Sequence, residues 1–179
     1  MTSFPRGPEG SIMKPLNSTK GARTRAPRAL PANPARFRLL MSLYPPLFFA
    51  GVRVDDVAED WTAIKVSHRV RPWNRNVNRS AFGGTLFAMT DPFYAVMAAG
   101  QLGSGYRIWN TFGSIEFLAP GIGTVSATMK LGADQVDMVR DEIRSCGHSV
   151  TTHVTEIRAA DGKLVARASQ NLYVRPIRS

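Results

Sequence analysis

The residues from Asn74 to Met97 hold the groups of this chain that could act on a substrate. A polar, asparagine-rich loop leads into the glycine pair Gly83-Gly84, and the almost wholly apolar segment that follows contains one carboxylate, Asp91. Paired glycines let a backbone approach a ligand closely, and the first turn of a helix leaves N–H groups free for an anion or a polarised carbonyl. A carboxylate in an apolar segment is costly unless it has a partner or a task. The stretch therefore predicts a site that binds an oxygen atom and acts on it.

Asp91 has two structural interpretations. Thr90, Asp91 and Pro92 together form a helix-start signature, in which Asp91 caps a helix that begins at Pro92 and performs no chemistry. If the helix instead begins at Gly84, Pro92 lies inside it and removes the hydrogen bond to the carbonyl of Ala88. The second interpretation predicts a kink that could re-aim Asp91. The residues by themselves leave both interpretations open.

Hydrophobic periodicity predicts the elements that hold this stretch. Asn33-Pro34 is typical of a helix start and Pro45-Pro46 of a helix end, so we expect a helix between them. A small amphipathic helix is expected over 134–145. Strands are predicted over 51–57, 61–70, 106–118, 124–131, 150–158 and 163–175.

The apolar segment after the glycine pair has no clear polar face, which is typical of a buried helix. One long buried helix among about six largely antiparallel strands indicates an α+β domain. We therefore predict a single domain whose sheet curls around the long helix, with an N-terminal helix and a small inserted helix.

The net charge of +10 is typical of nucleic-acid-binding proteins, but its distribution weakens that interpretation. The first 30 residues hold six Lys and Arg side chains, several prolines and a single acid, Glu9. Such a segment cannot bury enough apolar surface to order itself. We divide the chain into a disordered basic tail over 1–33 and a domain over 34–179, and expect no nucleic-acid partner. The tail could also reflect initiation at Met13 or later, an organelle transit peptide, or contact with a polyanion.

Several function classes are excluded by composition. The longest apolar candidate, 39–52, is interrupted by Ser42 and Pro45-Pro46 and falls short of the roughly 20 residues of a membrane span. Cys146 is the only cysteine, so an intramolecular disulfide is impossible, and we expect a cytoplasmic protein. No His, Cys or carboxylate set has metal-ligand spacing, so we predict no metal.

Three motifs in order carry a resemblance to a known family. They are RLLMSLYPP (Arg38 to Pro46), WNRN (Trp73 to Asn76) and FGGTLFAMTDPFY (Phe82 to Tyr94). Over about residues 36–175 the chain resembles the hotdog fold of the acyl-CoA thioesterase superfamily. It is most similar to the PaaI-like branch of phenylacetate degradation, and within it to a family described only as a domain of unknown function. In thioesterases of this branch a carboxylate follows the second glycine by seven residues, the position of Asp91 here.

The chain departs from the family motif at one point. Phe82 stands directly before the glycine pair, where the thioesterase motif has histidine, and Ala81 stands where nearer relatives often have it. The departure argues against the related hydratases and dehydratases, which rely on a catalytic histidine. It also keeps open a second function, a non-catalytic hotdog module that binds an acyl thioester or a lipid-like ligand.

The resemblance implies hydrolysis of an acyl thioester. The backbone N–H groups of Gly84 and Thr85 would polarise the carbonyl and stabilise the developing oxyanion. Asp91, contributed by the partner subunit, would activate water or attack directly. The resemblance thus implies a homodimer or a dimer of dimers, and no cofactor apart from the coenzyme A moiety of the substrate.

The remaining predicted contacts bind the substrate. Arginine suits phosphate recognition, and one or two of the arginines that flank the site or end the chain could hold the phosphates of coenzyme A. They are Arg71, Arg75, Arg79, Arg107, Arg175 and Arg178, of which we assign Arg75 and Arg107 to the site. Asn76 and Asn78 could contact the substrate from the loop, although an asparagine-rich loop is by default turn chemistry. Two residues beside the carbonyl-binding N–H group complete the predicted site, namely Phe82 and Gly83.

Overall fold

The N-terminal cap of the first helix forms as predicted. The computed structural model describes residues 33–177, so the predicted disordered tail, apart from Asn33, lies outside the described residues. The Asn33 side-chain oxygen accepts hydrogen bonds from the N–H groups of Ala35 and Arg36 at 2.8 and 3.2 Å. Proline at the first helical position then starts helix α1 (Pro34–Ser42).

The Pro45-Pro46 pair does not end this helix. Helix α1 already ends at Ser42, and Pro45 opens a second short helix, α2 (Pro45–Ala50). The physical reason is that the fixed φ of proline suits the first turn of a helix, where no N–H is needed, as well as it prevents a helix interior. The expectation that Pro45-Pro46 ends a helix was wrong, because this pair begins one.

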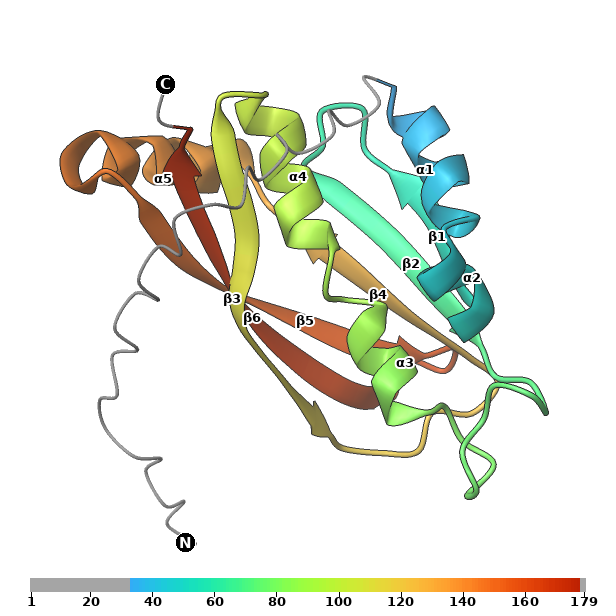
Figure 1. Cartoon of the computed structure of the whole chain (residues 1–179). Helices are drawn as coiled ribbons and strands as arrows, with labels where there is room; N and C mark the ends of the chain where they lie inside the picture. Colours follow the sequence, from blue (N-terminus) through green and yellow to red (C-terminus); the bar gives the residue numbers. More distant parts are fainter. Residues whose placement is uncertain (1–32, 178–179) are drawn as a thin grey trace, which may run out of the picture.

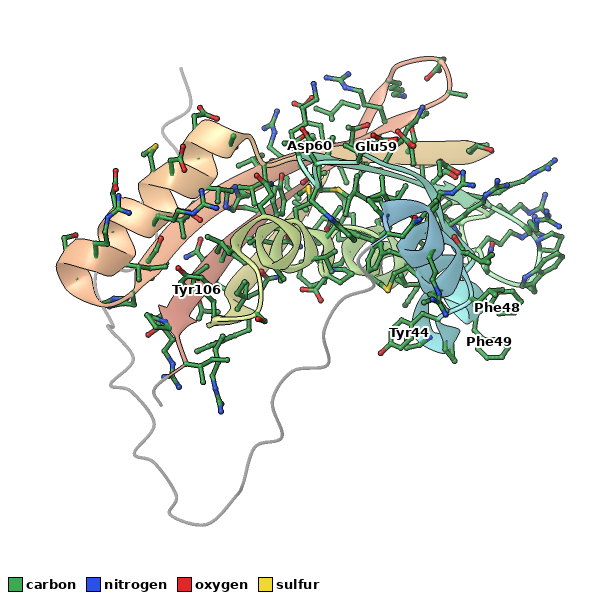
Figure 2. The ribbon with its side chains drawn as sticks, turned by 90° about the horizontal axis from the view of Figure 1, so that it is seen from above. Tyr44, Phe48, Phe49, Glu59, Asp60 and Tyr106 are labelled. Carbon is green, nitrogen blue, oxygen red and sulfur yellow. The ribbon has the colours of Figure 1, made fainter. Side chains whose placement is uncertain are left out.

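Six antiparallel strands form one unclosed sheet in the order β1-β2-β4-β5-β6-β3 (Figure 1). Their bounds are β1 (Val52–Val57), β2 (Ala63–Arg69), β3 (Tyr106–Phe117), β4 (Thr124–Lys130), β5 (Ser149–Ala159) and β6 (Leu164–Pro176). Each predicted strand is present to within a few residues. The sheet curves around the central helical region, which is clearest when it is viewed from above (Figure 2). The predicted α+β class is therefore confirmed.

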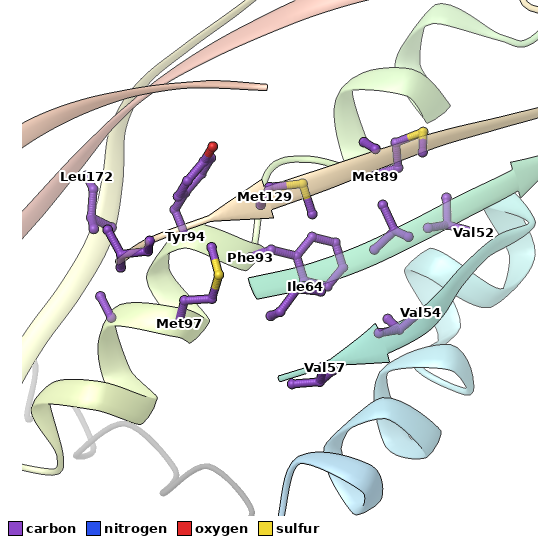
Figure 3. Packing of buried hydrophobic residues seen from close by; sticks show 14 of the residues in the cluster. Val52, Val54, Val57, Ile64, Met89, Phe93, Tyr94, Met97, Met129 and Leu172 are labelled. Atoms are coloured by element: carbon purple, nitrogen blue, oxygen red, sulfur yellow. The ribbon is translucent and has the colours of Figure 1, made fainter. Parts of the chain in front are cut away.

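The long central helical region runs from 83 to 102 and is broken in the middle. Helix α3 (Gly83–Ala88) and helix α4 (Phe93–Leu102) are separated by a turn over residues 89–92. Phe93 and Met97 of α4 are fully buried and point toward Ile64 and Met129 of the sheet (Figure 3). Each such buried side chain stabilises the fold by about 1.5–3 kcal/mol. Pro92 thus lies at a break between two helices rather than at a kink inside one continuous helix, and buried residues hold both helices against the sheet.

The inserted helix α5 (Ala133–Cys146) also matches its prediction. Val136, Val139 and Ile143 form its buried stripe, and Gly147 ends it with a φ of 76°, a left-handed conformation that glycine adopts without strain. Within residues 33–177, no helix is both long and apolar enough to cross a membrane.

The two edges of the sheet differ. At β1 the Ser42 hydroxyl accepts a hydrogen bond from the Val54 N–H at 3.1 Å and contacts its carbonyl at 3.4 Å, and Arg38 donates to the Asp55 carbonyl at 3.1 Å. Helix α1 therefore covers this edge. The outer edge of β3 has no strand paired to it within residues 33–177. An uncovered strand edge is a template for pairing with another chain.

Two buried histidines couple the stability of the fold to pH. Nδ1 of His68 donates to the Gly51 carbonyl at 3.1 Å, and the ring of His153 stacks on Tyr94 with 4.4 Å between ring centroids. Burial lowers the pKa of both histidines; for His68 the hydrogen bond to Gly51 opposes the effect of burial. Both rings are thus neutral in the folded protein at pH values where the unfolded chain already binds protons.

We expect the contribution of the two histidines to the unfolding free energy to be fully present above about pH 6.5. It should be lost as the pH falls from there toward the lowered pKa of each histidine. Each histidine contributes a slope of at most about 1.4 kcal/mol per pH unit in this window. Urea unfolding between pH 7 and 5 measures the slope, which His153→Gln should reduce and the exposed His148→Gln should not. An unchanged slope in His153→Gln would contradict this origin of the pH dependence.

Candidate active site

The glycine pair opens helix α3 with free N–H groups. The N–H groups of Gly83 and Gly84 have no hydrogen-bond partner among the described residues, as the first turn of a helix predicts. The Thr85 N–H, by contrast, donates to the Phe82 carbonyl at 3.0 Å, and Thr85 is buried. Of the two donors predicted for the oxyanion, the Gly84 N–H has no partner among the described residues, whereas the Thr85 N–H already donates within the turn.

Two aromatic rings pack where the glycines have no side chain. A Cβ atom at Gly83 would lie 2.8 Å from the ring of Phe117, and one at Gly84 would lie 2.6 Å from the ring of Phe82. Gly83 therefore allows the end of β3 to approach α3. Phe82, which stands where the family has histidine, is 56% exposed and lays its ring beside Gly84.

Asp91 lies exposed in the break between α3 and α4. Its own N–H donates to the Phe87 carbonyl at 3.2 Å, which closes the last turn of α3. Helix α4 has Pro92 as its N-cap residue and no side-chain cap, so Asp91 does not act as the cap of α4. The interpretation of Asp91 as a helix cap was wrong, and its carboxylate faces solvent at a helix break.

Asn110 of β3 holds this break. Its Nδ2 donates to the Asp91 carbonyl at 2.6 Å and to the Asp91 carboxylate at 3.3 Å. Its Oδ1 is buried and has no partner among the described residues. No sequence motif singled out Asn110. The available signal was its residue type, because asparagine is depleted in strands.

Buried polar side chains lie beneath the break. The Thr90 hydroxyl donates to the Phe87 carbonyl at 2.9 Å and accepts from Nε2 of Gln170 at 3.3 Å. The Tyr94 hydroxyl lies 3.0 Å from the Thr155 hydroxyl, and burial raises the pKa of Tyr94. Because every member of this group is buried, it anchors the turn at 89–92 to the sheet from below while Asp91 stays on the solvent side.

The asparagine-rich loop is ordered by its own side chains. Oδ1 of Asn76 accepts hydrogen bonds from the Asn78 N–H and from the N–H and hydroxyl of Ser80, and its Nδ2 donates to the Ala81 carbonyl at 3.3 Å. The polar side-chain atoms of Asn76 therefore form hydrogen bonds within the loop, as turn chemistry predicts. Asn78 is exposed, and its side chain makes no hydrogen bond to residues 33–177. Its predicted contact with substrate stays a prediction.

A cavity of about 460 Å³ lies between this loop and the end of β3. It is lined by Asn76, Ser80, Ala81, Gly83, Leu86, Phe117, Leu118, Ala119, Pro120 and Gly121. Its walls are mostly apolar, and Gly83 borders it. The cavity therefore opens beside the first turn of α3.

The two predicted arginines lie in different places. Arg75 is exposed in the loop, where it bridges to Ala81 next to the cavity. Arg107 pairs with Arg175 of β6, on the face of the sheet opposite to buried Val174 and therefore away from α3 and α4. The structure thus does not bring Arg107 together with Asp91. Within residues 33–177, no group of three His, Cys, Asp or Glu side chains could hold a metal ion.

The sequence matches the family described as "Domain of unknown function (DUF4442)" over residues 34–174. This chain belongs to the DUF4442 family. Among curated proteins, none matches the chain in sequence. The family description names no activity, so the function has to be argued from the site.

Solved structures share the fold of this DUF4442 chain. A protein of unknown function from Pseudomonas aeruginosa, described as a probable thioesterase, has a TM-score of 0.75 at 15% identity over 84% of this chain and 100% of its own. A thioesterase from Haemophilus influenzae has a TM-score of 0.62 at 15% identity, over 82% and 93% of the two chains. The PaaI protein of the E. coli phenylacetic acid degradation operon has a TM-score of 0.55 at 20% identity, over 82% of this chain and 92% of its own. The likeness shows the predicted hotdog fold.

We expect Asn110→Ala to loosen the turn at 89–92, because it removes both hydrogen bonds to Asp91. The loss should lower the unfolding free energy by about 0.5–1.5 kcal/mol. Asn78→Ala is the matched control, since an exposed asparagine without side-chain hydrogen bonds should change it by less than about 0.5 kcal/mol. Denaturant unfolding of both variants measures the difference, and equal stability of the two would contradict the role of Asn110.

Proposed function

We propose that this protein is an acyl thioesterase that hydrolyses an acyl thioester of coenzyme A with a water molecule activated by Asp91. The observation that carries the proposal is the pairing of an unpartnered Gly84 N–H at a helix start with an exposed carboxylate at a helix break. The first can bind a carbonyl oxygen, and the second can accept a proton. The hotdog fold shared with thioesterases supports the proposal without deciding the substrate.

The two groups act on one substrate only if they come from different subunits. Gly84 lies in the first turn of α3, and Asp91 lies beyond the last residue of α3, Ala88, in the turn that follows, so the length of α3 separates the two groups. A catalytic base must lie within hydrogen-bond reach of the water molecule that it activates. We therefore propose that the site uses Asp91 of a partner subunit.

The open edge of β3 supplies the way to bring them together. Asp91 is bonded to Asn110 near the middle of β3, and Gly83 packs on Phe117 at its end. We propose that two copies pair antiparallel along β3 about a two-fold axis that passes between the two copies of Gly113. This arrangement brings the Asn110 region of one subunit toward the Phe117 end of β3 in the partner subunit. Because the axis is perpendicular to the sheet, both helices stay on the same face, and two equivalent sites form.

The reaction then follows from the positions of the groups. The Gly84 N–H holds the carbonyl oxygen of the thioester, and the Asp91 carboxylate of the partner subunit takes a proton from water. The resulting hydroxide attacks the carbonyl carbon, and the negative charge on the oxygen is stabilised by the N–H and by the start of α3. When the intermediate collapses, the C–S bond breaks and the thiolate leaves with the proton. The products are a carboxylic acid and the free thiol.

One observation favours a second candidate function, a non-catalytic module that binds the same thioester. The ring of Phe82 lies beside Gly84 and replaces the polar side chain of the family motif. An apolar ring there would favour binding of the acyl group while contributing nothing to proton transfer. The two functions share a binding site and differ only in turnover.

We expect Asp91→Asn to lower kcat for acyl-CoA hydrolysis by about 10²–10⁴-fold, the usual contribution of a general base. The substitution keeps the size of the side chain, so KM should change little. A panel of acyl-CoA substrates with detection of the released thiol measures this effect. Asp137→Asn, an exposed residue of α5 paired with Arg140, is the control and should keep wild-type turnover.

Turnover that survives Asp91→Asn would contradict the catalytic role of the carboxylate. Saturable binding of acyl-CoA with no turnover in the wild type would instead support the non-catalytic module. Measuring binding and turnover on the same preparations separates the two functions.

A further inference from the structure

A second recess lies on the other side of the asparagine-rich loop. It has a volume of about 610 Å³, in the range typical of small-molecule sites. Helix α2, the start of β1, the end of β2 and the loop after β2 enclose it. Phe48 and Phe49 of α2 project from this side of the molecule (Figure 2). We call it the arginine groove, and the residues that line it are Ser42, Phe48, Phe49, Gly51, Val52, Arg53, Ser67, Arg69, Arg71, Trp73, Asn74 and Thr124.

All charged side chains that line the groove are positive. Arg53, Arg69 and Arg71 line it, and no acidic residue does. Arg53 has only a long contact with a carboxylate, 3.7 Å to Asp55, and neither Arg69 nor Arg71 has an ion pair among the described residues. Three guanidinium groups around one recess repel each other unless an anion lies between them. Their planar, multiply donating heads suit phosphate oxygens.

The groove also offers exposed aromatic faces. Trp73 is 72% exposed and Phe49 is 77% exposed, although rings of this size are normally buried. The guanidinium carbon of Arg71 lies 5.2 Å from the centre of the Trp73 ring, so charge and aromatic surface meet at one point. A ligand that combines phosphate with a planar base satisfies both features.

Asn74 builds the groove into the fold. Its Oδ1 accepts from the Arg71 N–H at 2.7 Å, and its Nδ2 donates to the Arg69 carbonyl at 3.1 Å. A Cβ at Gly51, whose φ is +75°, would lie 2.5 Å from Nδ2 of Asn74. Glycine at the end of α2 thus lets Asn74 fasten the turn that carries Arg69, Arg71 and Trp73. The backbone that carries the side chains of the groove is therefore fixed by hydrogen bonds.

One loop joins the groove to the candidate active site. Arg69, Arg71, Trp73 and Asn74 line the arginine groove, and Asn76, Ser80 and Ala81 line the cavity beside Gly83. Both ends of the loop are tied to the segment before β4, through Val70 N–H to the Gly123 carbonyl at 2.7 Å and Ala81 N–H to the Gly121 carbonyl at 2.8 Å. Asn74 orders one side of the loop and Asn76 the other, which explains its asparagine-rich sequence.

We propose that the arginine groove binds the nucleotide end of a coenzyme A thioester, with its phosphates on Arg69 and Arg71 and its adenine against Trp73. The proposal rests on the proposed function and sharpens it. It selects coenzyme A as the carrier, because an acyl carrier protein presents the same pantetheine arm without a nucleotide. Arg53, Ser67 and Arg69 lie on the face of β1 and β2 opposite to buried Val54 and Val66, so the pantetheine arm would pass around the end of the sheet along the loop after β2 to reach the thioester beside Gly84.

Other occupants fit the groove less well. A symmetric contact with a second copy would set Arg53, Arg69 and Arg71 against their own copies, at an electrostatic cost. A bilayer surface is flat and does not enter a recess, whereas the polar side chains of Ser67 and Thr124 line this groove beside the rings. The groove is thus matched to a compact anionic ligand.

Calorimetric titration of the full chain with adenosine 3′,5′-bisphosphate and with coenzyme A tests the site directly. We expect saturable binding of both, weakened about tenfold or more by the double variant Arg69→Gln, Arg71→Gln and by Trp73→Ala. Arg140→Gln together with Arg144→Gln, on α5, makes the same change of net charge away from the groove and should bind like the wild type. Circular dichroism of each variant checks that its fold is intact.

Hydrolysis of two substrates tests the link to the active site. The groove variants should raise KM for an acyl-CoA and leave kcat nearly unchanged. The N-acetylcysteamine thioester of the same acid, which has no nucleotide, should be hydrolysed at the same kcat/KM by wild type and variants. If the wild type hydrolyses neither substrate yet binds the bisphosphate with the predicted variant pattern, the proposed function fails and the nucleotide site stands.

Four results would overturn the proposal. The first is that the wild type shows no saturable binding of the bisphosphate, and the second is that the α5 control variant weakens this binding as much as the groove variants do. The third is that the groove variants lose binding to an acidic acyl carrier protein or to anionic phospholipid vesicles but still bind the bisphosphate. The fourth is that Trp73→Ala lowers the molecular mass in solution without affecting bisphosphate binding. The last two would assign the groove to another partner.

Discussion

Pro92 has no N–H to donate to the carbonyl of Ala88, and the helix that crosses the curved sheet cannot run straight through this position. The helix instead ends at Ala88 and restarts at Phe93, and both halves stay packed on the sheet. The break turns Asp91 toward solvent in a segment that is otherwise buried. Without it, a carboxylate in this helix would be paired or costly to bury. The exposed acid is thus a consequence of one missing backbone donor.

The same break connects the helix to the edge of the sheet. Asn110 holds Asp91 from β3, the one strand of the described sheet whose outer edge is neither paired nor covered by α1. In the proposed function, one copy of the chain carries two half-sites, a helix start near one end of β3 and a carboxylate near its middle. The proposed pairing of β3 with a second copy would complete both halves at once. The asymmetry between the covered β1 edge and the open β3 edge would make this pairing specific.

Local chemistry allowed much of the fold to be predicted from the sequence. Asn33 caps a helix through its own side chain, and the alternation of Val125, Ala127 and Met129 sets the buried face of β4. The kink at Pro92 was one of two interpretations that the residues left open. Pro45 was misjudged because proline serves a helix start as well as a helix end.

The site was less predictable because it depends on register. Asn110 reaches Asp91 because β3 runs beside the break between α3 and α4, whereas Arg107, three residues earlier in β3, faces the other side of the sheet. A bulge between Asn110 and Phe112 shifts this strand by one residue, and a shift of one residue exchanges the two faces. The occupied N–H of Thr85 was likewise invisible, since it follows from the tight first turn of α3. Contacts of this kind are fixed by tertiary structure rather than by residue type.

The central claim is that each active site combines Gly84 of one subunit with Asp91 of the other. The most direct measurement uses mixed dimers of Asp91→Asn and Gly84→Pro, co-expressed with different tags and purified through both. Proline removes the N–H at a helix position where it has no helical partner, and it also displaces the exposed Phe82 ring, which lies 2.6 Å from the position of a Cβ at Gly84. Each parent should be nearly inactive, whereas the mixed dimer should regain about half of the wild-type activity, because one of its two symmetric sites has both groups intact. A mixed dimer as inactive as its parents would contradict the shared site.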